Sequence, residues 1–184
     1  MKKTLIVAIA LIAFAFTACQ PTEPTKTDLL TKKGWTLSTA TSIPAFENKS
    51  GVTNENLFVS FFWDCEKDDI LNFNQNGSSI MDLGKLICDD QTGKELSLGN
   101  WRFLKNEEVL EFYLPYFFNE DNSFARLEAK IVALDANTLT LRIPLEYDNG
   151  LNPAKSGKIR NDRGVQDAKS VKNYEFILTY KVAK

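Results

Sequence analysis

The sequence predicts an all-β fold, an antiparallel meander of roughly eight strands that closes into a barrel. In several segments apolar residues recur at every second position, which is the period of a strand with one buried face. Short turn sequences, of which Asn76-Gly77 is the clearest, separate neighbouring segments. Few segments have a helical period. A meander of this many strands is expected to close because closure removes the exposed edges of an open sheet.

The first expected elements are a helical turn and a strand. Residues 28–33 are expected to make one turn of helix that ends at Gly34, since glycine is favoured just after a helix. Residues 35–40 alternate in character and predict a strand whose odd-numbered residues share one face. Residues 57–63 are almost all apolar, and this pattern suits either a buried strand or a short helix.

Two hairpins are expected next. Residues 70–73 and 78–81 flank a turn that ends in Asn-Gly, which predicts the first hairpin. Residues 100–104 are expected to pair with residues 109–114 in the second. Pro115 is expected to end that last strand, because proline cannot donate a hydrogen bond to a sheet.

The rest of the chain predicts three more strands and two long connections. The connections are the polar segments 85–98 and 148–172. The strands are expected at 125–131, 139–145 and 174–180, where apolar residues again occupy alternate positions.

The N-terminus has the pattern of a secretory signal peptide, in which Lys2 and Lys3 precede an apolar run over 5–16. This run is shorter than the roughly 20 residues that a membrane-spanning helix needs. Cys19 follows the small residue Ala18 and resembles the cysteine of a bacterial lipobox, which is acylated while the chain is cut before it. A plain signal peptide with an incidental cysteine is the alternative.

Cleavage before Cys19 divides the chain into a signal peptide (1–18), a lipidated tether (19–28) and one domain (29–184). The tether contains two prolines and is expected to be extended. Acylated Cys19 then anchors the protein in the lipid bilayer of the cell envelope, and we expect the outer membrane. The tether lacks a dense acidic run, which favours a periplasm-facing protein over a surface-exposed one.

The other two cysteines, Cys65 and Cys88, form an even pair once Cys19 is acylated. An oxidising envelope compartment favours a disulfide between them. The alternative is two buried free thiols.

Several segments together resemble one family. They are Leu29-Leu30 with Gly34-Trp35-Thr36-Leu37, residues 65–78, Cys88, residues 99–103 and residues 174–180. Their order is similar to that of the lipocalin-like domains found in many Bacteroidetes lipoproteins. The resemblance implies a lipocalin-like (calycin-type) barrel of eight strands on a lipid anchor, and it transfers no catalytic motif. Residues 57–63 and 148–172 look like insertions, and we expect them to cap one mouth of the barrel.

Aromatic residues of the expected strands are candidates for the barrel interior, where they either fill a core or line a small apolar cavity. We expect a module that binds a small apolar or amphipathic ligand. The alternative is a filled barrel, structural or protein-binding, whose loops contact an envelope protein. Residues 114–118 are expected to be buried under a loop or to form a contact patch. The candidate ligand-binding residues are Trp35, Phe73, Trp101, Phe103, Phe112, Tyr174 and Phe176.

The composition argues against several other functions. The chain has no histidine, which removes Ser-His-Asp catalysis and histidine-ligated zinc. Asp68 and Asp69 are adjacent, so in a strand they point to opposite faces and a structural role is expected. The net charge is −2 and no basic stripe is evident, which argues against nucleic acid as a partner. We therefore expect no enzyme, no metal and no cofactor.

Replacing Cys19 with Ala should release the protein from the membrane fraction, because the acyl chains supply the anchor. Fractionation of cells that express the wild-type and Cys19→Ala proteins measures this. Labelled fatty acid should enter the wild-type protein alone. A wild-type protein that never incorporates the label contradicts lipidation.

Overall fold

The computed structural model describes residues 23–47, 53–60, 62–88, 93–118, 124–146, 158–159 and 173–184. The expected signal peptide (1–18) and the lipidation site Cys19 lie outside the described residues, and so does most of the connection 148–172. The described elements, in chain order, are α2 (Lys26–Thr31), β1 (Trp35–Glu47), β2 (Thr53–Asn56), α3 (Leu57–Ser60), the 3-10 turn η1 (Asp64–Glu66), β3 (Ile70–Phe73), β4 (Ser78–Asp82), β5 (Glu95–Asn100), β6 (Arg102–Leu104), β7 (Val109–Phe118), β8 (Phe124–Leu134), β9 (Thr138–Glu146), β10 (Lys158–Ile159) and β11 (Asn173–Val182).

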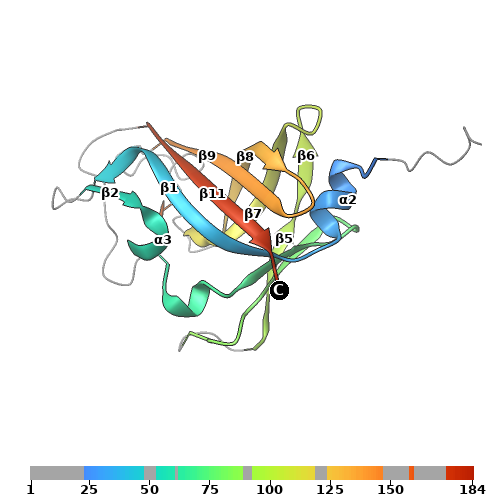
Figure 1. The fold of residues 1–184 in the computed structure, drawn as a ribbon, viewed down its shortest axis with the longest axis horizontal. Helices are drawn as coiled ribbons and strands as arrows, with labels where there is room; N and C mark the ends of the chain where they lie inside the picture. Colours follow the sequence, from blue (N-terminus) through green and yellow to red (C-terminus); the bar gives the residue numbers. More distant parts are fainter. Residues whose placement is uncertain are drawn as a thin grey trace, which may run out of the picture.

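The strands form an antiparallel meander that curls into a nearly closed barrel (Figure 1). Along one side the order is β1-β3-β4-β5, and along the other it is β7-β8-β9-β11, with β11 returning to β1. β5 and β6 are separated only by Trp101, and β6 pairs with β7, so this bent strand joins the two sides. The predicted all-β barrel is confirmed.

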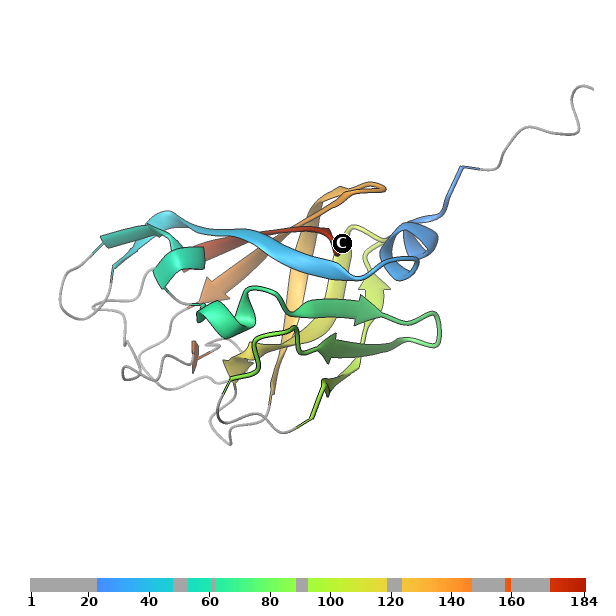
Figure 2. The same ribbon diagram turned by 60° about the horizontal axis from the view of Figure 1, so that its bottom comes forward.

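The strands pair unevenly around the ring. β1 pairs with β11 from Trp35 to Ile43, but it pairs with β3 only at Trp35 and Thr36. Beyond Thr36 the two strands diverge, and the far end of β1 pairs with β2 instead. Figure 2 shows α3 and η1 beside this widening part of the barrel, on the path of the chain from β2 to β3. The barrel therefore has a narrow end near α2 and a wide end near α3.

Three local predictions need correction. β5 begins at Glu95, inside the segment 85–98 that was expected to be a connection. Its residues pair with β4, and this pairing is not visible in the local sequence pattern. Pro115 does not end β7, which continues to Phe118. The proline is accommodated because regular pairing with β8 is interrupted between Tyr113 and Phe118. Part of the connection 148–172 also forms a strand, since β10 pairs with the end of β7.

The face assignment of β1 also needs correction. The pairing with β11 shifts between Leu37 and Thr39, so the strand contains a bulge there. After the bulge the even-numbered residues point inward, and Ala40 and Ser42 are buried while Thr39 is exposed. The sequence alternation predicted the opposite face for Thr39 and Ala40.

The expected helical turn is α2, which starts at Lys26, within the segment expected to be tether. Its N-terminus is fixed by a capping box, in which the Thr25 hydroxyl accepts from the backbone N–H of Asp28 while the Asp28 carboxylate accepts from the backbone N–H of Thr25. The Trp35 indole donates to the carbonyl of Leu30 at 2.9 Å. Both Leu30 and Trp35 are fully buried, so α2 covers the narrow end of the barrel.

At the wide end, a disulfide and side-chain hydrogen bonds hold two segments of the chain together. The predicted disulfide between Cys65 and Cys88 is present, and it joins η1 to the segment after β4. On the same two segments the carboxylates of Asp68 and Asp69 accept from the backbone N–H groups of Lys85 and Gly84, at 2.7 and 3.1 Å. The aspartates therefore have the structural role that the sequence predicted.

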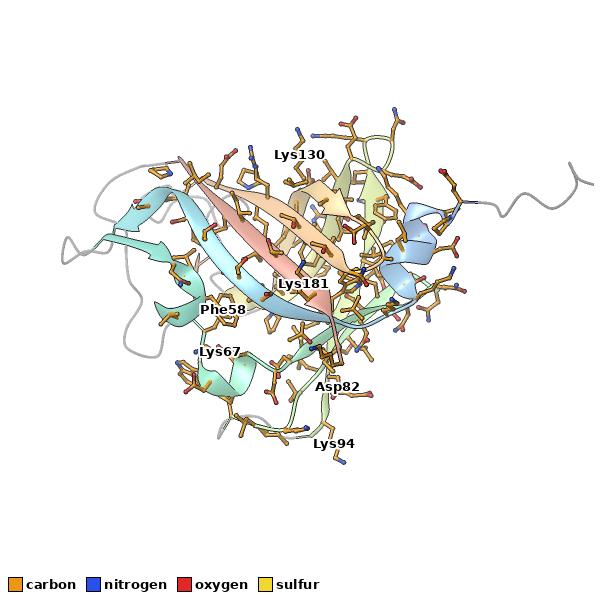
Figure 3. The ribbon with its side chains drawn as sticks, viewed as in Figure 1. Phe58, Lys67, Asp82, Lys94, Lys130 and Lys181 are labelled. Atoms are coloured by element: carbon orange, nitrogen blue, oxygen red, sulfur yellow. A yellow bond between two sulfur atoms is a disulfide. The ribbon has the colours of Figure 1, made fainter. Side chains whose placement is uncertain are left out.

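The apolar run after β2 is a helix rather than a strand. α3 begins at Leu57, which is buried in the core together with Phe62. Figure 3 shows Phe58 of α3 beside Lys67, whose ammonium lies 5.6 Å from the ring centroid. Lys67 also contacts the carboxylate of Asp64, at 2.6 Å. These contacts tie α3 to η1 at the wide end.

Removing the disulfide with Cys65→Ser and Cys88→Ser together should lower the free energy of unfolding by about 3 kcal/mol, because the unfolded chain gains the entropy of an open loop. Urea denaturation of the double variant and the wild type measures the difference. Cys19→Ala is the matched control and should leave the urea midpoint unchanged. Equal midpoints for all three proteins contradict a stabilising role of the bridge.

Candidate functional site

The candidate site is the apolar interior of the barrel. Alternate residues of the strands point inward and are buried, as on β11, where Tyr174, Phe176, Leu178 and Tyr180 alternate with half-buried or exposed neighbours. These residues belong to one core cluster that also includes residues of α2 and α3. The interior is thus one continuous apolar region between the two ends.

Four of the candidate aromatic residues pack against one another near the narrow end. The ring of Phe73 meets those of Trp101 and Phe112 edge to face, with centroids 5.7 and 5.9 Å apart. Trp101 also meets Phe103, at 5.5 Å. Trp35 lies in the same region, since its cross-strand partner is Leu71. We call Trp35, Phe73, Trp101, Phe103 and Phe112 the base cluster.

Trp101 also has a polar role in the base cluster. Its backbone N–H donates to the carbonyl of Gly77 at 2.7 Å, and its indole N–H donates to the carbonyl of Asn74 at 3.0 Å. Both acceptors lie in the β3–β4 turn, where Gly77 has a φ of +85° that favours glycine. The indole N–H groups of Trp35 and Trp101 are thus both bonded to backbone carbonyls. This arrangement supports a structural role for these two tryptophans.

The remaining candidate residues lie farther along the barrel. Phe176 is paired with Ser42 on one side and with Ile143 on the other, and Tyr174 lies two positions nearer the wide end. Both are almost fully buried. The structure therefore divides the seven candidate residues into the base cluster and a pair on β11 toward the wide end.

Small residues occupy several inward positions. On β1 these are Ala40 and Ser42, which point inward because of the bulge. Ser79 on β4 and Ala129 on β8 are also fully buried on the alternating pattern of their strands. Small side chains occupy less of the interior than the leucines and aromatics at neighbouring inward positions.

Tyr180 is an interior residue that was absent from the predicted site. Its side chain is 2% exposed, and its hydroxyl has no hydrogen-bond partner within the described part of the chain. Burial raises the pKa of this phenol above its usual value, so the group is neutral at physiological pH. The alternation from Tyr174 to Tyr180 was visible in the sequence, but no local pattern shows that the hydroxyl lacks a partner.

One buried charge lies on the outer side of the sheet. Glu111 of β7 is 8% exposed and accepts two hydrogen bonds from Arg102 of β6, at 2.7 and 3.2 Å. These bonds raise the pKa of the Arg102 guanidinium. Arg126 of β8 lies 3.8 Å from the same carboxylate. The carboxylate is therefore satisfied as a cross-strand ion pair.

Apolar side chains are exposed beside the disulfide at the wide end. Val59 and Trp63 lie on and after α3, and Leu86 and Ile87 directly precede Cys88. We call these four exposed residues the rim patch. The other expected contact segment differs, since Leu114 is fully buried and the side chains of residues 116–118 lie outside the description.

No protein-family model, no curated protein and no solved structure matches this chain. The lipocalin-like resemblance and the function it implies therefore stay predictions. Among the described residues, no three His, Cys, Asp or Glu side chains gather in a way that would hold a metal ion. Of the helices that the structure describes, none has the length and apolar character to cross a membrane.

Trp101→Ala should lower the free energy of unfolding by about 3–5 kcal/mol, because it removes a buried aromatic side chain. Trp63→Ala is the matched control, since Trp63 is 37% exposed and Trp101 only 8%. The control should change stability by no more than about 0.5 kcal/mol. Urea denaturation followed by circular dichroism measures both. Similar small losses in the two variants would contradict the structural role of the base cluster.

Proposed function

We propose that this chain is a lipid-anchored envelope protein whose barrel binds a small apolar or amphipathic ligand. The observation that carries the proposal is the apolar interior with small residues at inward positions. An apolar ligand gains about 25 cal/mol for each Å² of its surface that leaves water. Protein sites for such ligands are mostly apolar, with a few polar groups that set the orientation. No reaction is part of the proposal.

The fold supports a particular orientation on the membrane. α2 and Thr25 lie at the narrow end, and α3 lies at the opposite end in both views (Figures 1 and 2). Thr25 lies six positions after Cys19, and an extended chain of that length spans about 20 Å. The anchor would thus keep the narrow end near the bilayer and leave the wide end directed away from it. We propose an outer-membrane anchor with the domain facing the periplasm.

A second candidate function is protein binding through the rim patch. Trp63 directly precedes η1, and Leu86 and Ile87 precede Cys88, so these exposed residues lie on the two segments that the disulfide joins. Val59 is also exposed and lies on α3. Exposed apolar groups that are held together in this way are typical of contact surfaces, and aromatic residues are enriched in interfaces. In this case side chains would fill the interior of the barrel, and the barrel would serve to hold the rim patch in position.

The ligand proposal predicts saturable binding of a fluorescent apolar probe, such as N-phenyl-1-naphthylamine, by residues 19–184 carrying Cys19→Ala. Phe176→Leu should weaken this binding about tenfold, which corresponds to about 1.4 kcal/mol of lost contact. Val132→Ala is the matched control, because Val132 is 51% exposed, and it should bind like the parent protein. Titration of probe fluorescence measures all three.

Binding that is equally weak in all three folded proteins, with no saturation, contradicts the carrier function. Trp63→Ala separates the two candidate functions, since it alters the rim patch and leaves the interior unchanged. A carrier should bind the probe equally well with this substitution.

A further inference from the structure

The unpartnered hydroxyl of Tyr180 lies deep in the barrel. Tyr180 is paired across the sheet with Leu37 of β1 and with Leu139 of β9, and both of these side chains are buried. Two positions farther along β11, Val182 is paired with Trp35 of the base cluster. Tyr180 therefore points into the interior one inward position above the closed narrow end.

A buried hydroxyl without a partner is unfavourable, because it loses its hydrogen bonds to water and gains none in the protein. Phenylalanine would fill the same space without this loss. The neighbouring inward positions of β11 carry Leu178 and Phe176, which have no polar group in their side chains. A hydrogen-bond acceptor on a bound ligand would therefore satisfy this hydroxyl.

Between Tyr180 and the wide end, the inner face of β1 carries small residues. The inward residues of β1 after Leu37 are Ala40, paired with Leu178, and Ser42, paired with Phe176. Trp35 and α2 close the opposite direction. A ligand reaching the hydroxyl would therefore extend along β1 and β11 toward α3.

The charges of the interior constrain the chemistry of that ligand. Among the described residues, and apart from the tyrosines and tryptophans, the buried polar or charged residues are Ser42, Asp69, Ser79 and Glu111. No lysine or arginine belongs to this set, Glu111 is bonded to Arg102, and Asp69 accepts from Gly84. An ionised carboxylate bound at this depth would have no cation beside it, and burying such a charge is costly. A neutral acceptor meets no such penalty.

We propose that the Tyr180 hydroxyl donates a hydrogen bond to a neutral oxygen acceptor, such as an ester or ketone carbonyl, at the end of an aliphatic ligand that lies in the barrel. This inference rests on the carrier function proposed above and specifies its ligand class. The ligand enters with its carbonyl end first, and its aliphatic part contacts the wall formed by β1 and β11.

The test compares three ligands of similar length, methyl dodecanoate, dodecanoate and n-tetradecane, each delivered from cyclodextrin. Each displaces a bound fluorescent probe from residues 19–184 carrying Cys19→Ala, alone or with Tyr180→Phe. Tyr180→Phe should weaken binding of the ester about tenfold, because the ester carbonyl loses its hydrogen-bond donor. Alkane binding should not change. Dodecanoate should bind the parent protein more weakly than the ester.

Tyr113→Phe is the matched control, because Tyr113 lies on β7 between the inward residues Phe112 and Leu114 and its ring lies beside Gly99 on the neighbouring strand. It should bind the ester as tightly as the parent protein does. A thermal melt without ligand provides a second measurement. Tyr180→Phe should have an unchanged or higher melting temperature, since it removes an unsatisfied group.

Three results would overturn the inference. Ester binding that is unchanged by Tyr180→Phe shows that another group holds the carbonyl. A melting temperature lowered by several degrees shows that the hydroxyl is already satisfied in the free protein. Tighter binding of dodecanoate than of the ester contradicts the neutral acceptor. If none of the ligands displaces the probe from the parent protein, the carrier function itself is wrong.

Discussion

The attachment of Trp101 to the β3–β4 turn is the interaction on which the barrel depends. This residue stands between β5 and β6, the point where the sheet passes from the β1-β3-β4 side to the β7-β8-β9-β11 side. Its backbone and indole N–H groups both bond to the turn, at Gly77 and Asn74. The bend of the strand is thus fixed by two hydrogen bonds and by packing against Phe73. Without this attachment, the two sides would be joined mainly through β1 and β11.

The two ends of the barrel are stabilised by different means. The narrow end is closed by side-chain packing and by the hydrogen bond from Trp35 to the helix α2. At the wide end β1 and β3 are no longer paired, so hydrogen bonds between these two strands do not stabilise that end of the sheet. There the Cys65–Cys88 disulfide and the two carboxylates of Asp68 and Asp69 supply the connection. A covalent bond is effective at such a place because it limits the unfolded chain without needing a packed surface.

The sequence predicted those features that depend on local patterns. Alternation located β8, β9 and β11, the Asn-Gly turn located the β3–β4 hairpin, and the even number of cysteines predicted the disulfide. The bulge in β1 was not predictable, because it is defined by the register with β11. The same holds for Pro115 within β7, which depends on interrupted pairing with β8. Composition identified the aromatic residues, but only the register separates the base cluster from Phe176 and Tyr174.

The bulge links the shape of the sheet to the chemistry of the interior. Had the alternation continued through Leu37 without a shift, Thr39 would face inward and Ala40 and Ser42 would face solvent. The bulge instead presents two small residues to the inner side, along the wall that ends at Tyr180. A bulge also increases the local twist of a strand, which fits the divergence of β1 from β3 beyond Thr36. One extra residue in β1 thus contributes both to the widening of the barrel and to the small side chains that line its wall.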